Sequence, residues 1–390
     1  MSYQILIYCP DQHIQYKATT PDNEGVGGGI VARIRLAQNL AKQGHKVTLI
    51  SNVPYPHNSE GADFVPLQEA GKKREADVLL LISSGDDLSL EPAFDLPIQA
   101  RLREVWVQGT LPIKGIHDLD PAYVIAPSNF VRSVARKEWG VPRGRVVVIY
   151  NGLTERPRRW KPWKGANKRD PFALMYFSHP SKGLDAALSV FRLLRQKDDR
   201  YSLQVFGGNA LWGGEDQEIR EPGVTYHGTV GQKELLEQLR KCSISLHLQA
   251  RLEPFGMVVT ESMRQGCIPV ASPVGAYPET IQQGKNGFLV PGDHQDPQTH
   301  RVAAELIHQA VQDPDYMAYL RRHAQNIPWT WENQARVFAR HWSWELENEG
   351  ITLQRPDLCC PVCGGRWLLA ADGYHCLDCG RYAQGGQGTY

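Results

Sequence analysis

Two glutamates with a defined spacing are the first residues of this chain that could do chemistry. They are Glu253 and Glu261, eight positions apart within RLEPFGMVVTESMRQGCIPVAS (251–272). A carboxylate only accepts hydrogen bonds, so it suits the paired hydroxyls of a sugar. If the stretch is helical, the two carboxylates lie about 12 Å apart, roughly the span of a diphosphate with a sugar hydroxyl at each end. A capping glutamate followed by a solvent-facing helical glutamate would give the same spacing.

A helix N-terminus is expected between these two carboxylates. Pro254 suits an early helical position, and Gly256 and Met257 would then offer backbone N–H groups that have no partner within the helix. Such groups, together with the helix dipole, bind anions. SHPSKGLDAAL (178–188) indicates a second phosphate site, because Lys182 comes just before a helical pattern. An exposed lysine in a first helical turn would look the same.

A glycine-rich loop, NEGVGGGIVARIRL (23–36), follows the first expected strand and opens the first helix. Glycines such as Gly28 and Gly29 let the backbone approach a ligand at a helix N-terminus. The loop does not follow the G-x-G-x-x-G pattern. The next strand also ends, in LISNVP (49–54), without the acidic residue that binds ribose in dinucleotide-binding proteins. A nicotinamide cofactor is therefore disfavoured.

The last segment predicts a metal site. CCPVCGGRWLLAADGYHCLDCG (359–380) contains two C-x2-C pairs separated by twelve residues, the spacing of a tetrahedral structural zinc site. The expected zinc ligands are Cys360, Cys363, Cys376 and Cys379. Cys359 falls outside the spacing, and His375 is the fallback ligand. Four protein ligands leave no open position, so the zinc would be structural rather than catalytic, and the segment would need it to fold.

The bulk composition excludes some classes of protein. The chain has 390 residues, 42% of them hydrophobic and 22% charged, with a net charge of +1, so no global field favours nucleic acid or an anionic membrane. The N-terminus, MSYQILIYCP, reads as a strand rather than a signal peptide, and no apolar run approaches the roughly 20 residues of a spanning helix. A cytoplasmic location is expected. Cys9, Cys242 and Cys267 lie in apolar segments and are expected to be buried.

Elements that could position these residues come in two successive α/β patterns. The expected strands of the first are 5–8, 46–51, 78–83, 105–109, 123–128 and 146–151, with a helix over 29–44. Those of the second are 172–178, 202–208, 224–228, 243–249, 268–272 and 287–291, separated by helices. Strands that alternate with helices predict parallel sheets covered on both faces, and ligands of such sheets bind beyond the carboxyl ends of the strands. The fold expected is two doubly wound, Rossmann-like domains facing across a cleft.

The expected domain boundaries follow from these patterns. Residues 1–153 form the first domain and 171–330 the second, while 356–390 form the zinc-ribbon tail. Residues 154–170, rich in proline, Lys/Arg and tryptophan, read as a linker. A basic-aromatic contact with an anionic acceptor or a membrane surface is compatible with that interpretation.

The motifs in this order resemble the family-4 retaining glycosyltransferases of the GT-B fold, also called glycosyl transferases group 1. The resemblance rests on the E-x7-E spacing, GCIPVASPVGAYPETIQQGKNGFLVPGD (266–293), SKGLD, LQVFGG, GHKVTLIS and YVIAPSNFVR with VVVIYNG. It covers about residues 1–345 and is more specific in the second domain. It implies transfer of a sugar from a UDP-, GDP- or ADP-sugar to an unidentified acceptor, a glycan, lipid, protein or small molecule.

The resemblance also implies roles for particular residues. Glu253 would hold hydroxyls of the donor sugar, Glu261 those of the ribose, and Lys182 the diphosphate. Backbone N–H groups of Gly256 and Met257 would meet the diphosphate, Phe255 would belong to the same donor-binding set, and Gly28 and Gly29 would approach the phosphate across the cleft. Residues 227–230, with Gly228, Thr229 and Val230, would lie near the base. The C-terminal helix, about 331–349, would pack back on the first domain, and no catalytic metal is implied.

Two departures from the family pattern concern the reacting groups. Ser178 and His179 stand where the family often has an arginine before the lysine, so neutralisation of the diphosphate rests more heavily on Lys182. Where the family often has a first-domain histidine, this chain has Gln108 and Gly109, and the candidates for the contact to the reacting sugar are Gln108, His117 and Asp118. Retention in this family is thought to need no protein nucleophile, because the leaving diphosphate can help to deprotonate the acceptor.

Three functions stay open at this point. The first is retaining glycosyl transfer in glycan, polysaccharide or glycolipid synthesis, with a peripheral membrane contact as an option. The second is another reaction of a nucleotide sugar, such as epimerisation or hydrolysis. The third is a zinc-ribbon binding protein with a degenerate transferase body that touches nucleic acid, which the balanced charge disfavours.

Overall fold

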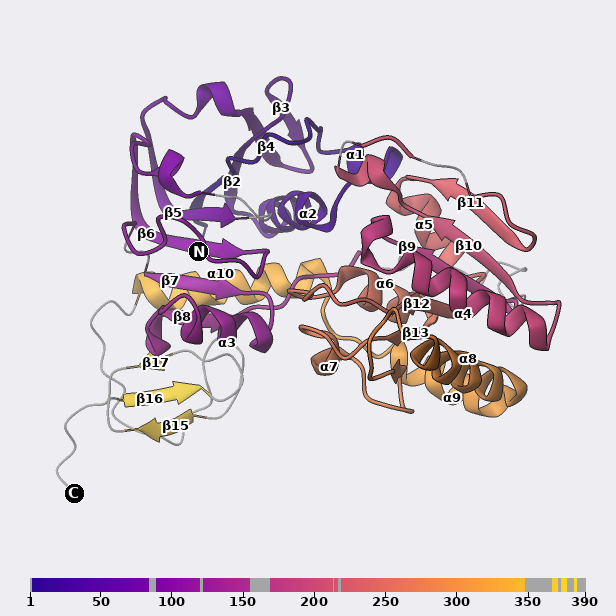
Figure 1. Ribbon diagram of the computed structural model, residues 1–390. Coiled ribbons are helices and arrows are strands. Elements are labelled where there is room, and N and C mark those ends of the chain that lie inside the picture. Colours follow the sequence, from indigo (N-terminus) through magenta and orange to yellow (C-terminus); the bar gives the residue numbers. More distant parts are fainter. Residues whose placement is uncertain are drawn as a thin grey trace. The chain divides into compact units, whose positions relative to one another are not determined.

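The computed structural model (Figure 1) describes residues 2–83, 89–119, 122–154, 169–212, 214–216, 219–347, 367–370, 373–376 and 382–383. The chain divides into two compact units. Unit 1 comprises the described residues of 1–18, 32–152 and 329–390, and unit 2 comprises Thr19–Val31 and the described residues of 153–328. Most of the expected linker, residues 155–168, lies outside the described residues. The assignment of Thr19–Val31 to unit 2 differs from the expected boundary at 153.

Unit 1 contains an eight-stranded sheet in the order β3-β4-β2-β1-β5-β6-β7-β8. Its strands are β1 (Gln4–Tyr8), β2 (Lys46–Ser51), β3 (His57–Ser59), β4 (Ala62–Pro66), β5 (Arg74–Ser83), β6 (Ile98–Val107), β7 (Tyr123–Ala126) and β8 (Val146–Val148). All neighbours pair in parallel except β3 with β4. The apolar runs of β1 and β5 are buried on both faces, as a parallel sheet covered by helices requires.

The antiparallel β3–β4 hairpin was not expected from the sequence. Its two-residue turn is made by Glu60 and Gly61, which both have positive φ, 53° and 89°. This is the geometry of a type I′ turn, which matches the twist of the flanking strands. The pair Glu-Gly is not one of the dipeptides that usually signal such a turn, and both strands are short. The sequence pattern therefore gave no clear indication of this edge of the sheet.

Helices of unit 1 include α3 (Asn129–Lys137) and α10 (Trp331–Glu347), and α2 (Gly28–Lys42) begins in the stretch that groups with unit 2. The side-chain hydroxyl of Ser128 caps α3 by accepting a hydrogen bond from the N–H of Val131. The described end of the chain adds a three-stranded antiparallel sheet of β15 (Trp367–Ala370), β16 (Gly373–Cys376) and β17 (Tyr382–Ala383).

Unit 2 contains a six-stranded parallel sheet in the order β11-β10-β9-β12-β13-β14. Its strands are β9 (Ala173–Phe177), β10 (Ser202–Phe206), β11 (Val224–Gly228), β12 (Ile244–His247), β13 (Ile268–Ala271) and β14 (Phe288–Leu289). Its helices are α1 (Thr20–Asn23), α4 (Leu184–Lys197), α5 (Gln232–Leu239), α6 (Met257–Gln265), α7 (Tyr277–Thr280), α8 (Pro297–Gln312) and α9 (Pro314–Ala324). Each expected strand of the second pattern corresponds to one of these strands.

Helix α10 docks on β6 through a fully buried carboxylate, that of Glu104. His341 Nε2 lies 2.5 Å from one oxygen of Glu104, and Trp342 Nε1 donates to the other at 2.8 Å. The ring of Phe338 packs edge-on against Trp106 of β6, with 5.4 Å between ring centroids. The carboxylate accepts two donors from α10, so the helix both covers the sheet and satisfies the one charge that β6 buries there.

We expect His341→Ala to lower the free energy of unfolding by about 3 kcal/mol, because it removes one donor from a carboxylate that stays buried. Urea unfolding followed by tryptophan fluorescence measures this change. Arg340→Ala, at an exposed position of the same helix, is the control. The double variant Glu104→Leu/His341→Leu should recover part of the loss, since it removes the buried charge together with its partner. Equal stability of His341→Ala and Arg340→Ala would contradict this account of α10.

Candidate functional site

The candidate site lies at the carboxyl edge of the unit 2 sheet. Parallel strands end at a common edge, so the segments that follow β9 and β12 leave the sheet side by side. The first runs through Ser178 and a 3-10 turn, η4 (Pro180–Lys182), into α4. The second runs through residues 248–256 into α6. These two connections carry most of the residues that the sequence singles out.

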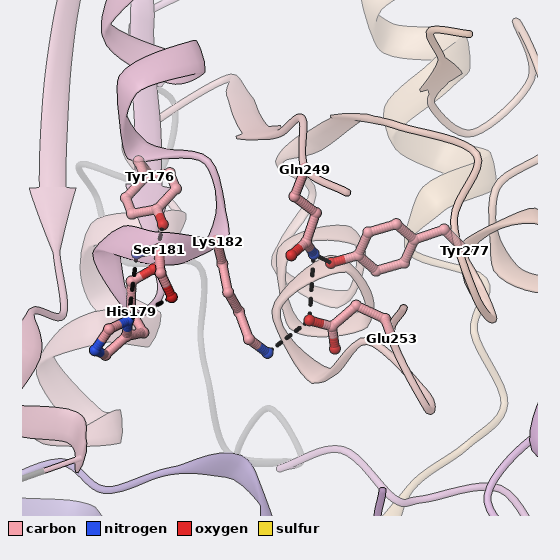
Figure 2. Close-up of polar contacts among 7 residues, drawn as sticks. All are labelled: Tyr176, His179, Ser181, Lys182, Gln249, Glu253 and Tyr277. Carbon is pink, nitrogen blue, oxygen red and sulfur yellow. Dashed lines mark hydrogen bonds and ion pairs between the residues drawn. The ribbon is translucent and has the colours of Figure 1, made fainter. Parts of the chain in front are cut away.

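Glu253 and Lys182 meet where these two connections approach each other (Figure 2). Lys182 Nζ lies 2.6 Å from Glu253 Oε1, and the side chains are 21% and 8% exposed. The same oxygen accepts a hydrogen bond of 3.2 Å from Gln249 Nε2. The lysine expected at a phosphate and the carboxylate expected at a sugar are therefore in direct contact in unit 2.

Helix α6 begins at Met257, which corrects the expectation that Pro254 occupies an early helical position. Gly256 is the N-cap, with φ of 87°, and a Cβ atom there would lie 2.4 Å from the ring of Tyr277. Glycine is thus required for both its conformation and its close packing. Glu253 precedes the helix and Glu261 lies within it. The distance between the two carboxylates therefore cannot be calculated from helical geometry alone. The first N–H groups of α6 still have no partner within the helix, and they lie at its N-terminal end, which follows Glu253 in the chain.

Glu261 lies inside α6 and is 6% exposed. Its Oε1 accepts a hydrogen bond of 2.8 Å from Gln232 Nε2, and Thr154 Oγ1 donates to the other end of that amide at 3.1 Å. The alternative of a solvent-facing glutamate at this position is therefore wrong. Gln232 instead holds a buried carboxylate in one orientation.

The turn that presents Lys182 depends on Gly183. Gly183 has φ of 95°, and a Cβ atom there would lie 1.8 Å from the carbonyl oxygen of Leu248. The His179 ring caps the turn, since its Nδ1 accepts from the N–H of Ser181 at 3.2 Å. Burial, aided by the nearby positive charges of Lys182 and Arg251, lowers the pKa of His179. The histidine that stands before Lys182 therefore adds no second cation near neutral pH.

The segment expected to lie near a base, residues 227–230, begins within β11 on the same sheet and continues beyond its end. His227, within β11, stacks on Phe206 with 4.1 Å between centroids and 2° between planes. Its Nε2 lies 2.8 Å from Gln204 Oε1, and burial lowers its pKa. Gly228, Thr229 and Val230 follow, and a Cβ atom on Gly25 would lie 2.2 Å from the Val230 carbonyl oxygen.

The glycines of the glycine-rich loop belong to unit 2. A Cβ atom on Gly28 would lie 3.3 Å from Met257 Cγ, at the start of α6, and Gly29 is the second residue of α2. Phe255, also among the expected site residues, is 3% exposed. Its side chain therefore contributes to packing.

The three candidates for the sugar contact from the first domain have different surroundings in unit 1. Gln108 and Asn151 pair through both amides, at 3.2 and 2.9 Å. His117 Nε2 contacts the carbonyl oxygen of Trp139 at 2.7 Å, and Asp118 is exposed. Gln108 directly follows β6, so it lies at the carboxyl edge of its sheet.

The expected zinc ligands lie mostly beyond the described residues. Cys360, Cys363 and Cys379 fall outside them, whereas Cys376 is the last residue of β16 and is buried. Within the described part of the chain, no group of three or more His, Cys, Asp or Glu side chains is arranged to hold a metal ion. Cys9, Cys242 and Cys267 are buried, as expected.

Reasoning from the sequence missed Gln249, Tyr277 and Gln232. Gln249 contacts both Glu253 and Tyr277, and Gln232 contacts Glu261. The only signal for Gln249 was its place: a large polar residue at the carboxyl end of the apolar run SISLHLQ (243–249). Its partners lie on other segments, so the sequence did not indicate them.

Acidification should destabilise unit 2 through His247, the last residue of β12. Burial, aided by the positive charge of Lys182, lowers the pKa of this histidine to about 3, against about 6.5 in an unfolded chain. Between these two pH values the unfolded state binds more protons, so the free energy of unfolding falls by up to about 1.4 kcal/mol per pH unit as the pH drops. Above this window the pKa shift adds no pH dependence.

Urea titrations at pH 7, 6 and 5 test this expectation with His247→Gln, which removes the titrating group. The variant should lose less stability than the wild type between pH 6 and 5, and His13→Gln, at an exposed position, should behave as the wild type. Parallel pH profiles of wild type and His247→Gln would refute the assignment.

In the described residues no helix is long and apolar enough to span a bilayer.

Solved structures share this architecture. HepE of Anabaena in complex with UDP-glucose aligns with a TM-score of 0.61 and 18% identity, over 87% of this chain and 99% of that one. Sucrose-phosphate synthase of Thermosynechococcus elongatus aligns with a TM-score of 0.66 and 15% identity, over 88% of this chain and 100% of that one. At these identities the likeness concerns the fold, which is an α/β GT-B architecture with two Rossmann-like sheets.

Curated relatives match part of the chain. A D-inositol 3-phosphate glycosyltransferase of Streptomyces griseus is 33% identical over 218 residues, 52% of this chain and 40% of that protein. One from Arthrobacter is 25% identical over 212 residues, 51% of this chain and 43% of that protein. The match thus spans less than half the length of these relatives. The model of the family glycosyl transferases group 1 matches residues 158–327 of this chain.

Proposed function

We propose that the protein transfers a sugar from a nucleoside diphosphate sugar to an acceptor with retention of anomeric configuration. One observation carries the proposal: Lys182 Nζ lies 2.6 Å from the buried Glu253 beside the N-terminus of α6, and a second buried carboxylate, Glu261, lies further along that helix. A cation, free helix N–H groups and two carboxylates are the groups that a diphosphate flanked by two polyols needs.

In this proposal Lys182 exchanges its contact with Glu253 for the diphosphate when a donor binds. The diphosphate of a donor offers Lys182 a stronger set of acceptor oxygens, and the helix N–H groups bind the same anion. Glu253 is then available to the hydroxyls of the sugar, while Glu261, held by Gln232, accepts from the ribose. Lys182 and the helix N-terminus stabilise the leaving diphosphate, with no catalytic metal assigned.

The remaining parts of the proposal concern the base and the acceptor. The stacked pair Phe206–His227 and the following residues Gly228, Thr229 and Val230 would border the base. The leaving diphosphate would help to deprotonate the acceptor hydroxyl, so no protein nucleophile is required. We propose that the transfer serves glycan, polysaccharide or glycolipid synthesis. We also propose that the donor is a UDP-, GDP- or ADP-sugar. Two observations support this proposal. The relatives from Streptomyces griseus and Arthrobacter are both named glycosyltransferases, and the structure of HepE contains UDP-glucose.

Thermal melts with UDP-glucose, GDP-mannose and ADP-glucose test the donor site. A ligand that binds only the folded state raises the melting temperature, so at least one of these should stabilise the wild type. We expect Lys182→Ala to weaken that donor at least about tenfold, because it removes a charge-assisted contact to the diphosphate. Glu261→Ala should do the same through the ribose.

Lys197→Ala is the matched control, since Lys197 forms an exposed ion pair with Glu305 on α8. The donor site is refuted if both site variants respond to the donor as the wild type does. Product analysis with and without acceptor sugars then separates transfer from hydrolysis or epimerisation of the donor.

We also propose that Cys360, Cys363, Cys376 and Cys379 bind one structural zinc ion, a proposal that rests on the two C-x2-C pairs. Strand β16 ends at Cys376, opposite Trp367 at the start of β15, and this antiparallel pair is compatible with the arrangement. The metal would brace the chain after α10 or present a surface to a protein partner.

Metal analysis of the purified protein should find one zinc per chain. Cys363→Ser should release it, because a tetrahedral site loses a thiolate ligand, whereas Cys359→Ser should retain it. Full zinc retention in Cys363→Ser, or its loss only in Cys359→Ser, would show that the ligand set is different.

A further inference from the structure

Gln249 is buried beside Glu253, and its backbone N–H and its side-chain NH2 group both donate hydrogen bonds. The residue is 3% exposed, and its backbone N–H donates to Ser272 Oγ at 3.0 Å. Its side-chain Nε2 donates to Tyr277 Oη at 2.9 Å and to Glu253 Oε1 at 3.2 Å. Its Oε1 is buried and has no hydrogen-bond partner among the described residues.

The direction of the Gln249 amide is dictated by its neighbours. An ionised carboxylate can only accept, so the NH2 group has to face Glu253, and the carbonyl oxygen has to point away from it. Tyr277 is fully buried, and this burial, with the charge of Glu253 close by, raises the pKa of its hydroxyl well above the usual value. Tyr277 therefore stays a neutral hydroxyl that accepts the second N–H. Figure 2 shows Gln249 Oε1 on the side that faces away from Tyr277.

A buried amide oxygen without a partner costs about 1–3 kcal/mol. Such an oxygen is therefore normally satisfied by ordered water or by a ligand. Here the oxygen belongs to the side chain that holds Glu253, which itself contacts Lys182. Gln249 Oε1 and the Glu253 carboxylate thus form two neighbouring acceptors beside a phosphate-binding lysine, and a polyol supplies donors for both.

We propose that Gln249 selects the donor sugar: its Oε1 accepts a hydrogen bond from one sugar hydroxyl, in an orientation fixed by Glu253 and Tyr277. This inference rests on the proposed function, because it assigns a sugar to the same site. It goes beyond that function in naming a residue that determines which donor sugar is preferred. The preferred donor carries a free hydroxyl at one ring position, and sugars that lack it leave the amide oxygen unpaired.

The experiment compares wild type, Gln249→Met and Tyr277→Phe by isothermal titration. The probes are UDP, GDP and ADP, then whichever of UDP-glucose, GDP-mannose or ADP-glucose binds the wild type best, and finally the four monodeoxy analogues of that donor. Methionine keeps the length of glutamine and removes its polar atoms. Thermal melts of each variant confirm that it is folded.

The wild type should bind one monodeoxy analogue about 10-fold to 100-fold more weakly than the parent donor, since the analogue leaves a buried acceptor unsatisfied. Gln249→Met should lose this preference at that one position and keep the preferences at the others. Its affinity for the nucleoside diphosphate alone should stay within about twofold of the wild type, because the amide faces the sugar. Tyr277→Phe keeps Gln249 and removes the hydroxyl that orients it, so it should lose part of the same preference.

Each failure has a distinct signature. If no nucleotide or nucleotide sugar binds the wild type, the proposed function and this inference both fall. If donors bind and Gln249→Met keeps every preference of the wild type, Gln249 Oε1 serves a bound water, and only the inference is overturned. If Gln249→Met does not fold, an unchanged preference in Tyr277→Phe overturns it.

Discussion

The partly buried contact between Lys182 and Glu253 is the interaction on which the candidate site depends. Neither charge is stable there by itself, since a partly desolvated ion needs a partner and further hydrogen bonds. The contact requires two left-handed turns at which only glycine fits, Gly183 before α4 and Gly256 before α6. It also requires that β9 and β12 are neighbours, so that the two turns arise at one edge of the sheet. Sheet order, glycine placement and charge pairing are thus parts of one arrangement.

The electrostatic character of the site depends more on the burial of its ionisable side chains than on the net charge of the chain. The chain carries a net charge of +1, yet the site pairs one cation with a carboxylate and keeps its histidines neutral. The pKa values of His179 and His247 are both lowered, first by burial and then by Lys182. The ammonium of Lys182 therefore acts without a second cation from these rings, and its position relative to Glu253 matters correspondingly more.

The sequence predicted the sheets well and the contacts poorly. The strands of unit 2 are near-continuous apolar runs bounded by glycine or polar residues, and such runs identify buried parallel strands. The start of α6 was misplaced because Pro254 suggested a helix, whereas the left-handed Gly256 ends a turn first. The β3–β4 hairpin was missed because its strands are short and its Glu-Gly turn lacks the usual dipeptide. Gln249 could not be recognised because Tyr277 is 28 positions away and only the fold brings the two together.

The docking of α10 through Glu104 has a consequence for the order in which the chain can fold during synthesis. Glu104 and His341 are 237 positions apart, and all of the unit 2 sheet lies between them. A ribosome that adds about 5–20 residues per second needs roughly 10 to 50 s to cover this interval. During that time His341 and Trp342, the two α10 partners of Glu104, have not yet been made, while the strands of unit 2 are being synthesised. The sheet of unit 1 therefore cannot reach its final packing against α10 until the chain of unit 2 has been synthesised.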